Sequence, residues 1–171
     1  FGKNSSIPHH LSGQAKLNKN QIVLLDFGVK INNYCSDMTR TVFFGRATLE
    51  FKQIYETVLK SQTKAIEFIN NFYSSSGAKR NREVSSRLRS NNKLLAKNID
   101  KASRDYIIDQ GFPNIPHSIG HGVGIEVHET PHLSPSSKEV IKPGMVFSVE
   151  PGIYIPGFGG VRIEDLIVVG K

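Results

Sequence analysis

The sequence has little cysteine and tryptophan and lacks long apolar runs. It contains one cysteine, Cys35, and no tryptophan among its 171 residues. A single cysteine excludes a disulfide-stabilised scaffold and a cysteine-rich zinc site, and it fits a reducing compartment, so we expect a cytoplasmic protein. No apolar run approaches the roughly 20 residues that span a bilayer, so we expect no membrane partner.

An initiator methionine is also missing, because the chain opens with Phe1-Gly2-Lys3. This opening has neither the basic nor the apolar region of a signal peptide. We expect the chain to be part of a longer protein.

The composition is that of a globular, turn-rich chain. Hydrophobic residues make up 38% and charged residues 22%, with 15 glycines and 8 prolines. These values exclude a disordered tail, a coiled coil and a collagen. The length fits a single domain over residues 1–171.

The positive charge is concentrated in one stretch. The formal net charge is +7, and most of it comes from eight basic residues: Lys79, Arg80, Arg82, Arg87, Arg89, Lys93, Lys97 and Lys101. We interpret residues 71–101 as a polar, basic insertion within the domain. A docking site for an anionic surface is the alternative. Because the basicity does not cover a whole face, we expect no nucleic-acid partner.

The hydrophobic pattern predicts strands, then helices, then strands. Thr48 is a candidate N-cap for a helix that ends at about Asn70, with an apolar stripe that includes Gln62. A shorter helix follows from Ile99 to Gln110. The expected strands are 22–26, mostly buried on both faces, then 36–44, 124–128, 144–150, 153–155 and 160–169. This order predicts an α+β domain with a curved, largely antiparallel sheet and helices on its outer face.

Four carboxylates stand where apolar strands end or are interrupted. Asp26 ends the first strand, and Asp37 follows across a short turn. Glu150 and Glu164 repeat this arrangement in a second hairpin near the end of the chain. Buried carboxylates are costly unless they are paired or bind a cation, and adjacent ones repel each other. Read singly, Asp37 is equally typical of a turn and Glu164 of a paired surface acid.

Histidines cluster near these acids. His121 lies in the glycine-rich segment 117–124, and His9 and His10 precede the first hairpin. One imidazole with four carboxylates is an oxygen-rich set that suits two divalent ions such as Mn²⁺ or Co²⁺ better than a structural zinc. Such ions lower the pKa of water, as a hydrolase requires.

Together, these residues resemble the pita-bread metallopeptidases, the family of aminopeptidase P, prolidase and methionine aminopeptidase. The segments that carry the resemblance are Leu25-Asp26-Phe27-Gly28, Ser36-Asp37-Met38-Thr39-Arg40-Thr41, Gly120-His121-Gly122-Val123-Gly124, His128-Glu129, Glu150-Pro151-Gly152-Ile153-Tyr154 and Val161-Arg162-Ile163-Glu164-Asp165. The match extends over nearly the whole chain apart from the insertion. Typical catalytic domains of the family begin upstream of Phe1, with a helix and strands that we expect to be missing here.

The resemblance implies a dinuclear centre. Its five ligands would be Asp26, Asp37, His121, Glu150 and Glu164. Asp37 and Glu164 would bridge the ions, and Glu150 would double as the general base. Mn²⁺ is the first expectation for the metal, with Co²⁺ and Zn²⁺ as alternatives.

The resemblance also implies roles for residues around the ions. His117 and His128 would hold the peptide group and stabilise the oxyanion. His9 would line the substrate pocket, Arg162 would accompany the last bridging glutamate, and Tyr154 would lie near the site.

Within the family, Arg162 and the 37–41 motif favour the proline-directed branch. The implied reaction is hydrolysis of Xaa-Pro bonds, in a dipeptide or at a peptide N-terminus, by a hydroxide that bridges the ions. The longer protein would be a homodimer. The alternatives are a methionine aminopeptidase and a non-catalytic peptide-binding relative.

Overall fold

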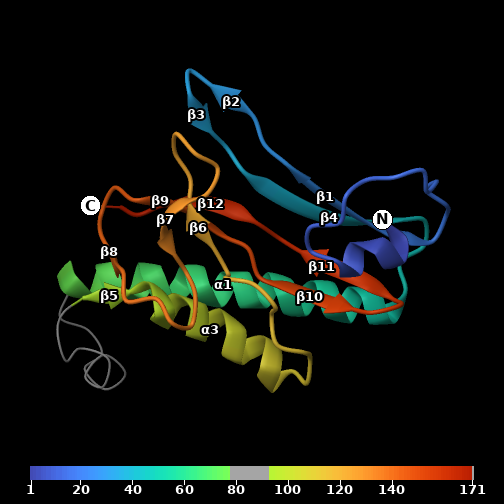
Figure 1. Ribbon diagram of the computed structural model, residues 1–171. Helices are drawn as coiled ribbons and strands as arrows, with labels where there is room; N and C mark the ends of the chain where they lie inside the picture. The colour runs from blue at the N-terminus through green and yellow to red at the C-terminus, as the bar shows by residue number, and fades with distance from the viewer. Residues whose placement is uncertain (78–92, 171) are drawn as a thin grey trace.

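The computed structural model describes residues 1–77 and 93–170 (Figure 1). The first half contains a short 3-10 helix, a long hairpin and a long helix: η1 (Gly2–Ser6), β1 (Gln21–Phe27), β2 (Lys30–Ile31), β3 (Tyr34–Cys35), β4 (Met38–Phe44) and α1 (Leu49–Gly77). Residues 93–170 contain one helix and eight short strands: β5 (Leu94–Leu95), α3 (Ala96–Asp109), β6 (His121–Gly122), β7 (Glu129–His132), β8 (Val140–Ile141), β9 (Val146–Val149), β10 (Gly152–Ile155), β11 (Gly159–Arg162) and β12 (Asp165–Val168).

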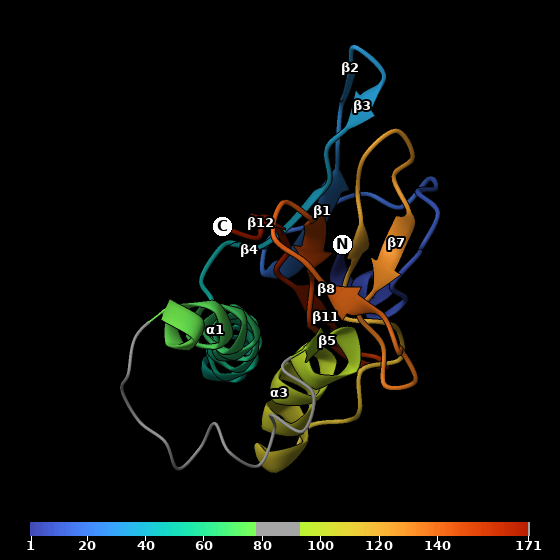
Figure 2. The same cartoon turned by 90° about the vertical axis from the view of Figure 1, so that its left-hand side faces the viewer.

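All strand pairs in the described residues are antiparallel, as predicted. β12, β9, β6 and β7 form a four-stranded sheet, and β10 pairs with β11 beside it. Figures 1 and 2 show α1 and α3 side by side against one face of these strands, with the β1–β4 hairpin on the other side. The α+β architecture with outer helices therefore agrees with the sequence-based prediction.

The first hairpin is longer than predicted. β1 and β4 pair from Gln21↔Phe44 to Phe27↔Met38, and β2 and β3 extend the hairpin to a tight turn. Asn32 and Asn33 form that turn with φ values of 49° and 68°, a conformation that asparagine tolerates. The first strand, 22–26, was predicted to be mostly buried on both faces, and this is wrong. Ile22 is buried, but Leu25 is 47% exposed, because its face of β1 is uncovered within the described residues.

The helix α1 begins at the predicted N-cap. The backbone N–H of Phe51 donates to Thr48 Oγ1 at 3.1 Å. The helix continues beyond Asn70 to Gly77, since Phe72 and Tyr73 still pack against the core. Of the predicted insertion 71–101, the first part thus belongs to α1, the last part to β5 and α3, and residues 78–92 lie outside the described residues.

Two strand predictions in the second half are wrong in detail. Residues 124–128 form a loop, in which Gly124 N–H donates to the carbonyl of Glu126 at 3.0 Å. The strand predicted over 160–169 is two strands, β11 and β12, because Glu164 forms an isolated bridge to Thr39 of the first hairpin instead. In residues 1–77 and 93–170, no helix is both long and apolar enough to cross a membrane.

Candidate metal centre

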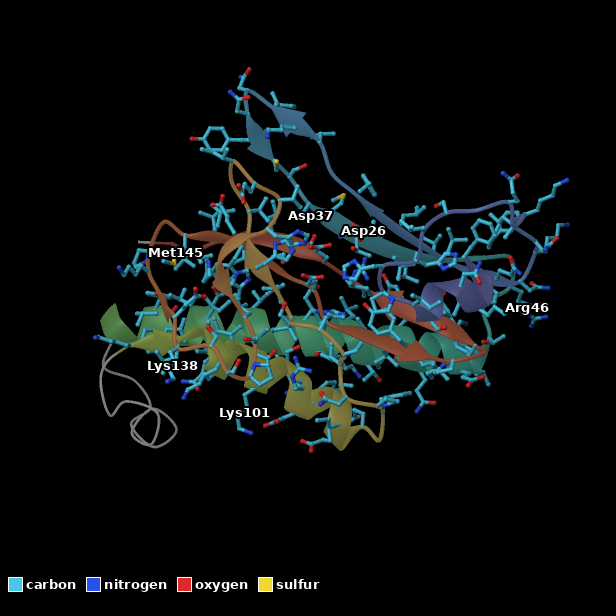
Figure 3. All side chains as sticks on the ribbon, viewed as in Figure 1. Asp26, Asp37, Arg46, Lys101, Lys138 and Met145 are labelled. Atoms are coloured by element: carbon cyan, nitrogen blue, oxygen red, sulfur yellow. The ribbon has the colours of Figure 1, made fainter. Side chains whose placement is uncertain are left out.

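A cavity of about 870 Å³ lies beside the first hairpin. Every predicted site residue except Tyr154 lines this cavity: His9, Asp26, Asp37, His117, His121, His128, Glu150, Arg162 and Glu164. Asp26 and Asp37 lie close together on the hairpin (Figure 3). The structure thus brings together residues from distant parts of the sequence.

Three overlapping groups in the described residues could each hold a metal ion. They are Asp26–Asp37–Glu164, His121–Glu150–Glu164 and Asp37–His121–His128, and within each group the candidate ligand atoms lie within 4.8 Å of one another. The five predicted ligands therefore form one continuous cluster. His128 joins this cluster as well, although its resemblance-based role is to contact substrate.

Asp26 and Asp37 meet because the hairpin ladder is interrupted. Asp26 pairs with Thr39 near the end of β1, whereas Asp37 lies between β3 and β4. Burial and the nearby charge of Asp26 raise the pKa of Asp37 above its ordinary value. Two carboxylates in this arrangement repel each other unless a cation or a shared proton lies between them.

His121 is held in a tautomer that suits metal binding. Its Nδ1 lies 3.1 Å from the carbonyl oxygen of Gly122, so Nδ1 carries the proton of the neutral ring and Nε2 is the nitrogen that loses its proton to bind a metal. Nε2 lies 3.3 Å from Glu150 Oε1 and 3.7 Å from Asp37 Oδ2. Burial lowers the pKa of His121, but the Glu150 hydrogen bond, the Gly122 carbonyl and the charges of Glu150 and Asp37 outweigh this and raise it to about 8.

The glycines beside His121 allow close packing of strands. A Cβ at Gly120 would overlap the carbonyl oxygen of Ser148, and one at Gly122 would overlap that of Thr130. The missing side chains therefore let neighbouring backbone approach closely at both glycines. This packing fixes the position of His121 relative to β9.

Glu150 follows β9 directly and is ionised. Its burial raises the pKa, but the hydrogen bond with His121 and the positive charges of His121 and Arg162 lower it below its ordinary value. Ser148 Oγ donates to Glu150 Oε1 at 3.3 Å and accepts the His121 backbone N–H at 3.0 Å. Sequence reasoning did not identify Ser148 as a residue of the site.

Glu164 provides the test of whether the site fits a cation. Its side chain is 2% exposed, and its Oε1 is the buried side-chain oxygen that has no hydrogen-bond partner within the described residues. Burial and the charge of Glu150 raise the pKa of Glu164 to about 7. An unpartnered buried carboxylate oxygen beside three other acids fits a divalent cation, so the donor set agrees with the implied centre.

Thr39 and Arg162 connect the two hairpins next to the acids. Thr39 Oγ1 donates to Glu164 Oε2 at 2.7 Å and accepts from Arg162 Nε at 3.1 Å. Arg162 Nη2 donates to Asp26 Oδ2 at 2.5 Å. Thr39 was not predicted as a site residue. It lies two residues after Asp37 in the 36–41 motif, so the alternation of a strand could have indicated that it faces the site.

His117 is neutral and oriented by Tyr154. Its Nδ1 lies 2.7 Å from the Ser118 carbonyl oxygen, so that nitrogen carries the proton, and its Nε2 accepts from the Tyr154 hydroxyl at 2.8 Å. Burial lowers the pKa of His117 and raises that of Tyr154 to about 12, so neither group is charged at neutral pH. Arg162 Nη1 donates to the same hydroxyl at 3.1 Å.

The remaining predicted residues lie at the rim of the cavity. The ring centroids of His128 and His121 are 4.1 Å apart, and His128 belongs to the 124–128 loop. His9 follows Pro8, whose carbonyl accepts from Arg162 Nη1 at 3.3 Å. Both imidazoles are placed to contact a molecule inside the cavity.

Comparisons with known proteins identify the family of the chain. Residues 1–171 match metallopeptidase family M24. An uncharacterised peptidase from Staphylococcus haemolyticus is 42% identical over 170 residues, which cover 99% of this chain and 42% of the relative. The chain therefore spans less than half the length of this curated relative.

Two solved structures have the same fold. The prolidase from Pyrococcus furiosus superposes with a TM-score of 0.82 at 34% identity, over 99% of this chain and 44% of that one. The X-Pro aminopeptidase from Thermotoga maritima gives a TM-score of 0.83 at 32% identity, over 99% and 43%. The expected pita-bread fold is thereby confirmed.

Proposed function

The chain belongs to metallopeptidase family M24, and from this premise we propose that it forms the metal-binding part of a dinuclear hydrolase that cleaves Xaa-Pro peptide bonds. The observation that carries the proposal is the cluster of Asp26, Asp37, His121, Glu150 and Glu164 around one cavity. Residues 1–171 would form part of the catalytic domain.

The proposed ligands balance the charge of two ions. Four carboxylates carry four negative charges when ionised, and two divalent cations neutralise them. Asp37, Glu164 and His121 each belong to two of the three candidate ligand groups, and of these three only the two carboxylates have a second oxygen with which to bridge two ions. The ions would supply Lewis acidity, which lowers the pKa of water from 15.7 towards about 7.

The side chains around the ions would bind substrate and move protons. Glu150, which is ionised, would accept a proton from the attacking water. His128 and His9 would contact the peptide from the rim. Since Nε2 of His117 accepts from Tyr154 in this arrangement, His117 donates to a substrate oxygen only after this hydrogen bond rearranges.

Proline specificity is supported by the neighbours and by Arg162. The similar structures are named as a prolidase and an X-Pro aminopeptidase. Arg162 links Asp26 to Tyr154, so the arginine that distinguishes the proline-directed branch touches both a proposed ligand and the residue that orients His117. Mn²⁺ as the metal, a cytoplasmic location and a homodimer of the longer protein complete the proposal.

An assay of the intact protein tests the substrate. After chelation, Mn²⁺, Co²⁺ and Zn²⁺ are each added back, and Xaa-Pro dipeptides, longer Xaa-Pro peptides and Met-Ala-type peptides are compared. We expect two bound ions per chain and hydrolysis of Xaa-Pro substrates. Preferred cleavage of Met-Ala-type peptides would show a methionine aminopeptidase, and binding of peptide without hydrolysis in all three metals would show a non-catalytic relative.

Metal binding should release protons near neutral pH. Without metal, Glu164 with a pKa of about 7 and His121 with a pKa of about 8 are largely protonated at pH 6. Metal must displace these protons, so affinity should fall by about tenfold per displaced proton for each pH unit below these values. Calorimetric titration at pH 6.5 in buffers of different ionisation enthalpy measures the release.

The folding stability of the metal-free protein should fall as pH rises, whereas its metal affinity should increase. Glu164 and His121 both have a folded-state pKa above the ordinary value, so the stability that these two groups contribute is present at low pH. It is lost as pH rises through about 7 for Glu164 and 8 for His121. Thermal unfolding with and without Mn²⁺ checks this, since metal should stabilise most at high pH. Buffer-independent binding enthalpies together with a flat stability profile would contradict the assignment of both groups.

A further inference from the structure

The strand ladder of the second hairpin is interrupted at its two glutamates. On one side of the interruption Asp165 pairs with Val149, and on the other Gly152 pairs with Arg162. Ile163 N–H donates to the carbonyl of Pro151 at 3.4 Å. Proline has no N–H, so Pro151 cannot return a hydrogen bond to the Ile163 carbonyl.

Gln62 of α1 reaches this interruption from the outer helix. It is 4% exposed although its neighbours in the helix stripe are apolar. Its Nε2 lies 3.1 Å from the carbonyl oxygen of Val149 and 3.5 Å from that of Ile163. These are the residues immediately before Glu150 and Glu164.

A third acceptor fixes the orientation of the Gln62 amide. Its Nε2 also donates to Asp165 Oδ2 at 3.0 Å. Because three oxygen acceptors surround this atom, it must be the nitrogen of the amide. Arg40 connects the same network to the site, since it donates to Asp165 Oδ1 and to the carbonyl of Glu164, both at 2.6 Å.

We propose that Gln62 is a positioning residue that fixes the spacing of Glu150 and Glu164 by binding the backbone before each of them from outside the sheet. The inference rests on the proposed dinuclear site. The amide has two N–H groups, and its two shorter contacts, to Val149 and Asp165, already join both chain segments, so it resists their separation or sliding. Without that contact, Glu150 still follows β9 and Glu164 still precedes β12, but the distance between the two carboxylates is no longer fixed.

Metal affinity distinguishes this role from simple core stabilisation. In the intact protein, Gln62→Met removes the donors at nearly constant volume, and Gln62→Asn keeps an amide that is too short to reach both carbonyls. Gln53→Met is the matched control, because Gln53 is an exposed glutamine on the same helix. Mn²⁺ is titrated calorimetrically or by competition with a chelating dye, and unfolding midpoints are recorded without metal.

We expect both Gln62 variants to raise the Kd of the weaker-bound Mn²⁺ by at least about tenfold, within the 10–100-fold range of residues that support metal ligands. Saturating Mn²⁺ should restore kcat, with KM unchanged, and the control should match the wild type. An unchanged Kd in a variant with a lowered unfolding midpoint would overturn the positioning role and leave the proposed function intact. If the wild type itself binds no Mn²⁺, both the proposed function and this inference fail.

Discussion

Glu150→Gln is expected to lower kcat for peptide hydrolysis by about 10²–10⁴, the usual contribution of a general base. Glutamine has the same shape as glutamate but cannot accept a proton at neutral pH. Burial raises the pKa of Glu150, but the His121 hydrogen bond and the positive charges of His121 and Arg162 outweigh burial and hold this pKa below its ordinary value. This carboxylate is therefore available as a base at neutral pH.

Steady-state kinetics with a measurement of bound metal separates the two proposed roles of Glu150. If the variant keeps its ions and loses kcat, the proton-accepting role accounts for the loss. If saturating Mn²⁺ restores the rate, Glu150 acts as a ligand only. Glu56→Gln, an exposed position on α1, is the matched control and should retain full activity. Full activity of Glu150→Gln would contradict its assignment.

Arg104→Met is expected to destabilise the fold by about 3–5 kcal/mol, because it leaves a buried charge without its partner. Asp100 is 1% exposed, and its carboxylate accepts from Arg104 Nε at 2.8 Å and from Nη2 at 2.7 Å. Arg104 also donates to the carbonyls of Ile115 at 2.6 Å and His117 at 2.9 Å. The same substitution therefore loosens the segment that carries His117.

Urea unfolding of the metal-free protein measures this effect. Lys101→Met is the matched control: Lys101 and Asp105 form an ion pair of the same spacing on the same helix, but at the exposed surface (Figure 3). The control should leave the unfolding midpoint nearly unchanged. Arg104→Met/Asp100→Leu should recover part of the loss, since no buried charge remains. Equal midpoints for Arg104→Met and Lys101→Met would refute the prediction.

Two acids of the site, Asp26 and Glu150, were predictable because each contradicts its local pattern. Both end apolar strands, where a buried carboxylate requires a partner; the structure largely buries Glu150, whereas the Asp26 side chain is 44% exposed. The periodicity of α1 was equally clear, since the stripe from Phe51 to Ile69 is largely buried. Local sequence therefore identified the acid-bearing strands and the principal helix.

Other features depend on contacts between distant segments. The alternation in Gly124-Ile125-Glu126-Val127-His128 is typical of a strand, yet Ile125 is 60% exposed in a loop at the cavity rim. Arg104 and Asp100 are spaced like a surface ion pair, yet both are buried, and Arg104 also donates to the carbonyls of Ile115 and His117. Gln62 appears in the predicted stripe, but its role depends on carbonyls from the far end of the chain.

The isolated bridge between Thr39 and Glu164 is the point at which the two hairpins touch beside the acids. Each hairpin contributes acidic ligands to the proposed centre, so neither hairpin can complete a coordination sphere by itself. Bound ions would crosslink the first and last quarters of the polypeptide, and chelation should increase hydrogen exchange most at this junction. Catalytic competence would then depend on docking of the two hairpins, a later event than the formation of either one.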